Sequence, residues 1–332
     1  MTRLKRPVSS RARLFAALLV IVPGTISLAR AQGEFELRLL RPSITVSGIG
    51  VQRADFTDVD SDYSAANGTL FAMIPLGGVR LRPDKRVIAW QPMLTMGAGV
   101  TSQSFEVVDR EPRLYTGLLN GSVLFASSKP NLHYISVGAS FAEDEETVND
   151  LELRVSAFYL GSYQKSPNFT WLYGGAYTFI YGRGLLLPAF GLIWKPSDHW
   201  SLYGLLPFAW TLSQRFNEHL RLNYMLWASG QQFGFQNDGL FPITDDKVYE
   251  RVREQHLGVE LEWRPGRDFM ILTQVGIATA RRMAFTPIAS GADNLLDEAI
   301  DPAPYARLAF RILLGKSLTD ELGGKVQDAD AP

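Results

Sequence analysis

The chain contains no cysteine among its 332 residues. Disulfide bonds and thiolate metal sites are therefore excluded as sources of stability. After residue 31 no segment approaches the roughly 18 uninterrupted apolar residues that mark a membrane-spanning helix. A basic excess is also lacking, because residues 1–31 hold six of the 33 Lys and Arg residues, which leaves 27 against 34 Asp and Glu. This acidic balance argues against a nucleic-acid partner.

The amino terminus has the pattern of an export signal. Basic residues between Arg3 and Arg13 precede an apolar core from Leu14 to Val22, and Ala29-Arg30-Ala31 has the small-x-small form of a cleavage site. The apolar core is too short to cross a bilayer, which takes about 20 residues. We therefore expect residues 1–31 to be a cleaved signal peptide of a Gram-negative bacterium.

Most of the remaining chain alternates between apolar and polar or small residues. The clearest example is residues 257–280: Leu257–Trp263 alternate with glycine and charged residues, and a turn at 265–267 follows. In the next segment every second residue faces the same way. One face holds Phe269, Ile271, Thr273, Val275 and Ile277, and the other holds Met270, Leu272, Gln274, Gly276, Ala278 and Ala280. This period of two predicts a β-hairpin with one apolar face. In an exported chain, the repetition of such segments is typical of an outer-membrane β-barrel.

We expect an all-β fold, a transmembrane antiparallel β-barrel over residues 32–314, followed by a polar periplasmic tail at 315–332. A periplasmic β-sandwich is the alternative, since its strands also alternate. Many candidate segments here exceed ten residues, whereas strands of globular proteins average about 5–6, so their length favours the barrel. The candidate strands are 43–54, 67–82, 86–102, 113–126, 131–142, 150–162, 169–181, 185–195, 199–213, 218–235, 248–264, 268–282 and 303–314.

These candidates are odd in number, although bacterial single-chain barrels have an even number of strands. Either Pro207 divides 199–213 into two strands, or 131–142 is a short companion of its neighbour. We expect about 12 strands, and 14 or 10 remain open.

Charged residues on the polar face should point into the lumen, because an Arg or Lys facing lipid costs about 2–4 kcal/mol at the bilayer midplane. Rings of such charges can select solutes, and they can also form a satisfied network without any filtering role. The candidate luminal and selectivity residues are Glu152, Arg154, Arg221, Glu260, Glu262, Arg264, Arg307 and Arg311.

The connections fall into two kinds. Short proline turns at 82–85, 129–131, 195–198 and 264–267 are expected on the periplasmic side. Longer acidic loops are expected outside, around Asp58, within 143–150 and within 293–301. These loops could meet lipopolysaccharide, divalent cations or a partner protein. Residues 58–62 faintly resemble a calcium loop, and solvated loop charge is the favoured reading of them.

Residues 184–207, GLLLPAFGLIWKPSDHWSLYGLLP, resemble the core hairpin of a family of bacterial outer-membrane β-barrels known only as a domain of unknown function. The matched features are Leu187-Pro188, residues 191–194, the turn at 196–198, and Trp200 leading to Leu206-Pro207. The resemblance implies an outer-membrane barrel and implies no reaction.

The strongest candidate for catalysis is His199-Trp200-Ser201, whose His-x-Ser spacing resembles that of membrane lipid hydrolases. Trp200 is the better lipid-facing residue, which turns His199 and Ser201 away from a lipid substrate. We therefore predict no catalytic residue and no enzyme activity. The other histidines share no ligand spacing, so neither a metal nor a cofactor is expected.

The leading functional prediction is a channel or transporter for a small solute or an apolar molecule. The alternative is a non-conducting structural barrel, and a lipid hydrolase is the remote third possibility. The expected partners are outer-membrane lipid, lipopolysaccharide and, during biogenesis, the barrel-assembly machinery.

Overall fold

The computed structural model describes residues 41–57, 61–76, 80–81, 87–105, 113–127, 131–178, 184–237, 241, 243, 247–287 and 294–315. The signal peptide and almost all of the predicted tail lie outside these residues. The described elements are β1 (Ser43–Asp55), β2 (Asp62–Pro75), β3 (Arg80–Leu81), β4 (Val87–Phe105), β5 (Arg113–Ser127), β6 (Leu132–Asp144), η1 (Thr147–Asn149), β7 (Arg154–Ser166), β8 (Phe169–Thr178), β9 (Leu185–Trp194), β10 (Trp200–Leu206), β11 (Ala209–Arg215), β12 (Leu220–Gln236), β13 (Lys247–Trp263), β14 (Phe269–Pro287), β15 (Leu296–Ile300) and β16 (Ala303–Leu313).

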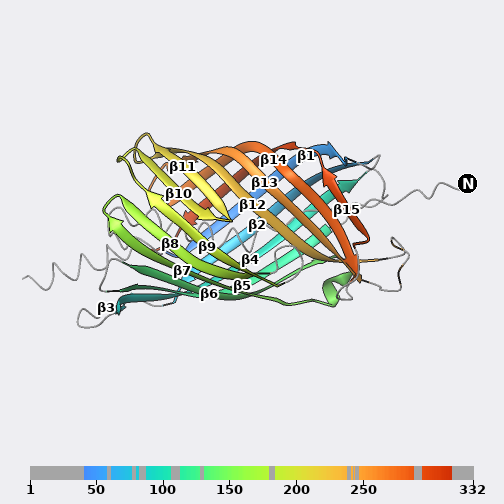
Figure 1. Ribbon diagram of the computed structural model, residues 1–332, viewed down its shortest axis with the longest axis horizontal. Helices are drawn as coiled ribbons and strands as arrows, with labels where there is room; N and C mark the ends of the chain where they lie inside the picture. Colours follow the sequence, from blue (N-terminus) through green and yellow to red (C-terminus); the bar gives the residue numbers. More distant parts are fainter. Residues whose placement is uncertain are drawn as a thin grey trace, which may run out of the picture.

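Fourteen strands close into one antiparallel barrel (Figure 1). Each strand pairs with the next along the chain, from β4 to β14. β1 pairs with both β2 and β16, and β16 pairs with β14, which completes the circle. β15 pairs with the last part of β14, and β16 pairs with its first part. β15 and β16 together therefore count as one strand of the barrel. β3 is a two-residue addition to β4.

The expected count of about 12 strands was wrong, and 14, the second possibility, holds. Pro207 divides 199–213 into β10 and β11, which pair in register from Trp200–Gln214 to Leu205–Ala209. The turn between them is closed by the Phe208 amide, which donates to the Leu205 carbonyl at 2.8 Å. The segment 131–142 is the full strand β6 and not a short companion.

An even count also puts both chain ends of the barrel on one side. We call this side the turn end: the turns at 195–198 and 264–267 lie there, beside the start of β1 and the end of β16. Backbone hydrogen bonds from Leu313 to Asp268 and from Leu314 to Pro42 fix this arrangement. The opposite side, with the connection around η1, is the loop end. The proline turns at 82–85 and 129–131 fall largely outside the described residues.

The two faces of the wall follow the predicted alternation. On β13, Leu257 and Trp263 are 58% and 47% exposed, whereas Glu260 and Glu262 are buried. An outward apolar face and an inward charged face are the arrangement of a barrel that stands in hydrocarbon. No helix in the described part of the chain is long and apolar enough to cross a membrane.

A β-bulge corrects the predicted pattern of β14. Ala280 was expected on the same face as Ala278, but Ala280 is exposed and Arg281 is buried. The register shifts between Arg253 and Gln255, and Ala280 has a φ of 46°. The extra residue re-aims the strand, so that Arg281 points into the lumen.

Because a left-handed backbone costs a non-glycine residue about 1–2 kcal/mol, we expect Ala280→Gly to raise the unfolding free energy by about 1 kcal/mol. Urea unfolding in lipid vesicles measures this change. Ala278→Gly is the matched control, because Ala278 sits in the regular ladder and its replacement should destabilise the barrel.

The wall is interrupted on the loop-end side of the β10–β11 turn; along the wall, upper means toward the loop end and lower means toward the turn end. β9 pairs with β8 along its whole length, but it pairs with β10 only from Phe190 to Trp194. β12 pairs with β11 only up to Trp227. In the described chain, residues 185–189 of β9 and 229–231 of β12 therefore have no strand on the facing edge. We call this interruption the wall break; the short yellow β10–β11 hairpin that borders it on the turn-end side is visible in Figure 1.

Candidate functional site: the barrel lumen

One side of the lumen is apolar. Inward residues of β4 to β10, together with the β10–β11 turn, pack into a cluster that we call the apolar cluster. It consists of Met93, Leu124, Tyr134, Phe158, Leu160, Leu172, Ala176, Ala189, Ile193, Tyr203, Leu205 and Phe208. All are inward because each occupies the buried parity of its strand. The sequence search for charged luminal residues missed this surface, although residues 185–193 are apolar or small on both faces, which indicates an apolar inner face for this strand.

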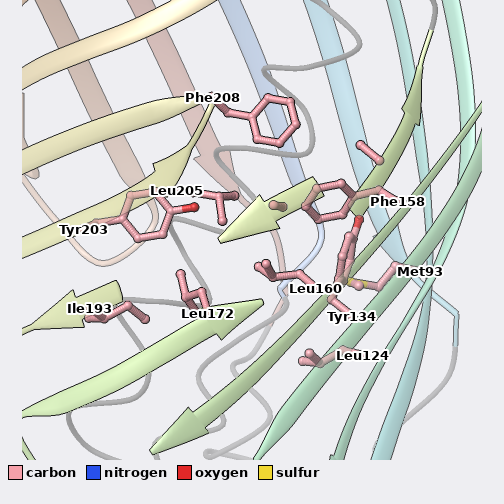
Figure 2. Packing of buried hydrophobic residues seen from close by; sticks show 12 residues of the cluster. Met93, Leu124, Tyr134, Phe158, Leu160, Leu172, Ile193, Tyr203, Leu205 and Phe208 are labelled. Atoms are coloured by element: carbon pink, nitrogen blue, oxygen red, sulfur yellow. The ribbon is translucent and has the colours of Figure 1, made fainter. Parts of the chain in front are cut away.

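Aromatic rings connect the β6–β7 wall to the end of the short hairpin (Figure 2). The Tyr134 and Phe158 ring centroids lie 6.1 Å apart, and those of Phe158 and Phe208 lie 6.5 Å apart, in an edge-on contact. Phe208 is only 6% exposed. The apolar cluster thus extends to the lower border of the wall break.

The opposite side of the lumen is polar. Asn223, Glu260, Gln274 and Arg307 stand opposite one another on β12, β13, β14 and β16. The Asn223 amide donates to Glu260 Oε1 at 2.8 Å, and Ser213 extends the row by donating to Asn223 Oδ1 at 2.7 Å. The charges of Glu260 and Arg307 also interact. We call this row the polar belt.

The structure brings several predicted luminal charges together near the turn end. Glu262 is buried, with Arg264 Nη2 at 2.7 Å and Arg221 Nη1 at 3.8 Å. Arg311 lies apart from this group, and its Nε donates to Thr45 Oγ1 at 3.1 Å. Glu260, Glu262, Arg221 and Arg307 all occupy inward positions of their strands.

A buried charged group that the sequence reading missed lies further toward the loop end. Glu254 Oε1 accepts from Arg281 Nε at 3.1 Å, and Glu254 Oε2 lies 3.1 Å from His256 Nε2. The His256 ring stacks on Trp227 at 4.2 Å between centroids. Glu254 and His256 share the parity of Glu260, which could have placed them in the lumen. Arg281 could not be placed that way, because the bulge changes its face.

Two apolar groups fill the loop end. Leu114, Ala142, Phe233, Phe235, Val248 and Phe285 form one, against which Phe241, Ile243, Leu295 and Leu296 pack. Phe56, Tyr63, Ala65, Met283 and Ile300 form the other. The first group comes from β5, β6, β12, β13 and β14, and the strand residues of the second come from β2, β14 and β15, so these strands carry an apolar inner face at the loop end.

Beside the wall break, the connection from β6 to β7 holds the free edge of β12. Arg154 Nη1 donates to the Gln232 carbonyl at 2.9 Å, and the Gln236 amide donates to Asp144 Oδ2 at 2.8 Å. Edge strands commonly need such cover, because their backbone groups would otherwise be left without partners. We call this contact between the β6–β7 connection and β12 the latch.

Glu143 is the buried centre of the latch. It is fully buried beside Gly234 of β12, with Lys247 Nζ at 3.0 Å and Arg154 Nη2 at 3.5 Å. This corrects the prediction that Glu143 and Asp144 belong to an acidic outer loop, because both are the buried last residues of β6. A further correction concerns Glu152: β7 begins at Arg154 rather than at 150, so Glu152 lies in the connection, where it accepts from the Tyr249 hydroxyl at 2.5 Å.

The candidate catalytic pair has other contacts. His199 lies in the β9–β10 turn, and its Nδ1 is 3.1 Å from the Arg215 carbonyl oxygen. Ser201 stands opposite Ser213 on β11. In the described residues no group of three or more His, Asp or Glu side chains could hold a metal ion. Asp58 and Asp60 of the acidic loop lie outside those residues.

A family model described as "Domain of unknown function (DUF6268)" matches residues 131–311, more than half of the chain. The chain belongs to the DUF6268 family. This confirms the resemblance seen in residues 184–207. No curated protein matches the chain.

Solved structures similar to this barrel include three bacterial membrane proteins. The COG4313 outer membrane channel from Pseudomonas putida F1 has a TM-score of 0.44 at 10% identity, over 83% of this chain and 96% of that one. The translocator domain of the autotransporter NalP from Neisseria meningitidis has 0.38 at 11%, over 89% and 96%. The Pseudomonas putida toluene transporter TodX has 0.34 at 11%, over 92% and 95%. Scores and identities this low support no statement about the function of this chain.

Proposed function

We propose that this protein is an outer-membrane barrel that passes a small apolar or amphipathic molecule through its lumen. The observation that carries the proposal is the apolar cluster, since a lumen that served water and ions alone would be polar, as in porins. Export to the outer membrane is supported by the signal pattern of residues 1–31 and by the exposed apolar outer face.

The polar belt supports an amphipathic solute in particular. An apolar molecule that fits against Leu160 and Leu205 would face Asn223, Glu260 and Arg307 across the lumen. Pockets that bind small ligands commonly combine an apolar lining with a few polar groups that fix orientation. Arg307 and Glu260 are accordingly the selectivity residues we propose, with Arg221, Glu262, Arg264 and Arg311 acting nearer the turn end.

A channel of this kind should carry little ion current, because apolar side chains form much of its inner face, both in the apolar cluster and at the loop end. We therefore expect radiolabelled naphthalene to enter intact Gram-negative cells faster when they produce the protein, while the purified protein shows no steady conductance in planar bilayers. A sealed structural barrel would show neither faster uptake nor conductance, and an open aqueous pore would show conductance.

Leu160→Arg tests the apolar cluster directly. Leu160 is 7% exposed within the cluster, so a charge there both occupies the path and opposes an apolar solute. We expect naphthalene uptake to fall at least about tenfold, which corresponds to about 1.4 kcal/mol of added barrier. Leu160→Met, of similar volume, is the matched control and should keep the uptake.

Heat-dependent migration on gels shows whether each variant has assembled as a barrel. If Leu160→Arg does not assemble, Leu205→Gln replaces it at the neighbouring end of the cluster. Undiminished uptake through an assembled Leu160→Arg or Leu205→Gln barrel would contradict the proposal.

A further inference from the structure

We infer that the solute crosses between the lumen and the membrane sideways, through the wall break, rather than along the barrel axis. This inference rests on the proposed function and names its route. Three features of the wall carry it: the size of the break, the side chains that surround it, and its level on the apolar outer face.

The first feature is the size of the break along β12. Its lower border is the Ala228 amide, which donates to the Phe208 carbonyl at 2.9 Å, and its upper border is the Gln232 carbonyl held by Arg154. Four residue steps at about 3.4 Å each separate these borders, or about 14 Å along the strand. That length exceeds the long dimension of a small aromatic molecule such as naphthalene.

The second feature is what surrounds the break. On the luminal side, Phe208 and Phe158 of the apolar cluster lie at its lower border. On the outer side, the β9 edge presents Leu186, which is 78% exposed, and the facing β12 edge presents the small residues Ala228 and Gly230. An apolar molecule would therefore meet apolar or small side chains along the strand edges of the break, with the polar Gln255 and Arg253 of β13 beyond the β12 edge on the outer face.

The third feature is the level of the break relative to the apolar outer face. Leu226 stands opposite the exposed Leu257, whereas Ala228 and Gly230 stand opposite Gln255 and Arg253. The break thus lies at the loop-end margin of the apolar face. The apolar cluster reaches the break at Phe208, so the break connects this cluster with the margin of the apolar outer face.

An unpaired strand edge is costly beside hydrocarbon, because its amides and carbonyls lose water without gaining partners. The latch covers β12 from Gln232 to Gln236 and leaves residues 229–231 without a facing strand. The arrangement thus fixes the size of the gap: the latch closes the wall above it and the β10–β11 hairpin closes the wall below it.

Reversible blockage of the break tests the route, and the absence of native cysteine makes a single introduced thiol unique. Gly230→Cys places the thiol on the outward face of β12 at the break. Leu226→Cys, four residues away on the same face of the same strand, places it where β11 and β13 both pair with β12. Both assembled variants are treated with benzyl methanethiosulfonate, checked by mass spectrometry, and later released with dithiothreitol.

We expect modification of Gly230→Cys to lower naphthalene uptake at least fivefold, with recovery after release, and modification of Leu226→Cys to leave uptake unchanged. Equal uptake by modified and unmodified Gly230→Cys barrels, with uptake still lost in Leu160→Arg, would overturn the sideways route and keep the proposed function. Retained uptake in Leu160→Arg would instead overturn the proposed function itself.

Discussion

Glu143→Ala should lower the unfolding free energy by about 3–5 kcal/mol, the range found when one partner of a buried ion pair is removed. Glu143 is fully buried, and the side chains of Lys247 and Arg154 beside it are 10% and 6% exposed. The substitution leaves both cations buried without their carboxylate. Urea unfolding in lipid vesicles, followed by tryptophan fluorescence, measures the loss.

Glu145→Ala is the matched control, because Glu145 lies two residues away in the same connection and is exposed. Its effect should stay within about 0.5 kcal/mol. A Glu143→Ala barrel as stable as the Glu145→Ala barrel would show that the latch contributes nothing to closing the wall.

Val259→Arg should cost about 2–4 kcal/mol, the penalty for an arginine on the lipid face near the bilayer midplane. Val259 is central in the outward row Leu257–Trp263 of β13 and stands opposite Tyr224 and Val275, which also face outward. Folding into vesicles over a urea series measures the change in free energy.

Gln255→Arg is the comparison for Val259→Arg. Gln255 is outward on the same strand, four residues toward the loop end, where the outer face becomes polar. An arginine near the interface costs only about 0–1 kcal/mol. Equal penalties at both positions would contradict the placement of the apolar face in hydrocarbon.

The barrel itself was predictable because the period of two records which face of each strand is apolar. The placement of Glu260 and Glu262 followed from their parity on 248–264, and the closing of residues 303–314 onto the first strand followed from the barrel topology. The strand number was less accessible. Pro207 signals an interruption, but the sequence does not say whether the chain bends or reverses there.

Other features depend on contacts between distant segments. Arg281 changes face through a one-residue bulge at Ala280, which shifts a pattern without altering its composition. Glu143 and Asp144 look like loop charge until β12 is brought against them. The apolar cluster is assembled from seven strands and one turn, so a single segment such as residues 185–193 indicates only a small part of it.

The acidic-loop alternative has less free charge to use than the sequence suggested. Besides Glu143 and Asp144, Asp297 accepts from Arg282 Nε at 2.5 Å, and Asp62 Oδ2 lies 3.1 Å from Arg53 Nε. Carboxylates already engaged by cationic side chains are weaker ligands for divalent cations or lipopolysaccharide. A role for these loops in binding such partners remains a prediction.

The most direct test of the apolar lumen is a crystal of the barrel grown with 1-bromonaphthalene, in which anomalous scattering locates the bromine. We expect the bromine peak inside the barrel, within van der Waals contact of Phe158, Leu160 or Leu205, and displaced in Leu160→Arg. Bromine found only on the outer face, at the same sites in both proteins, would contradict the account.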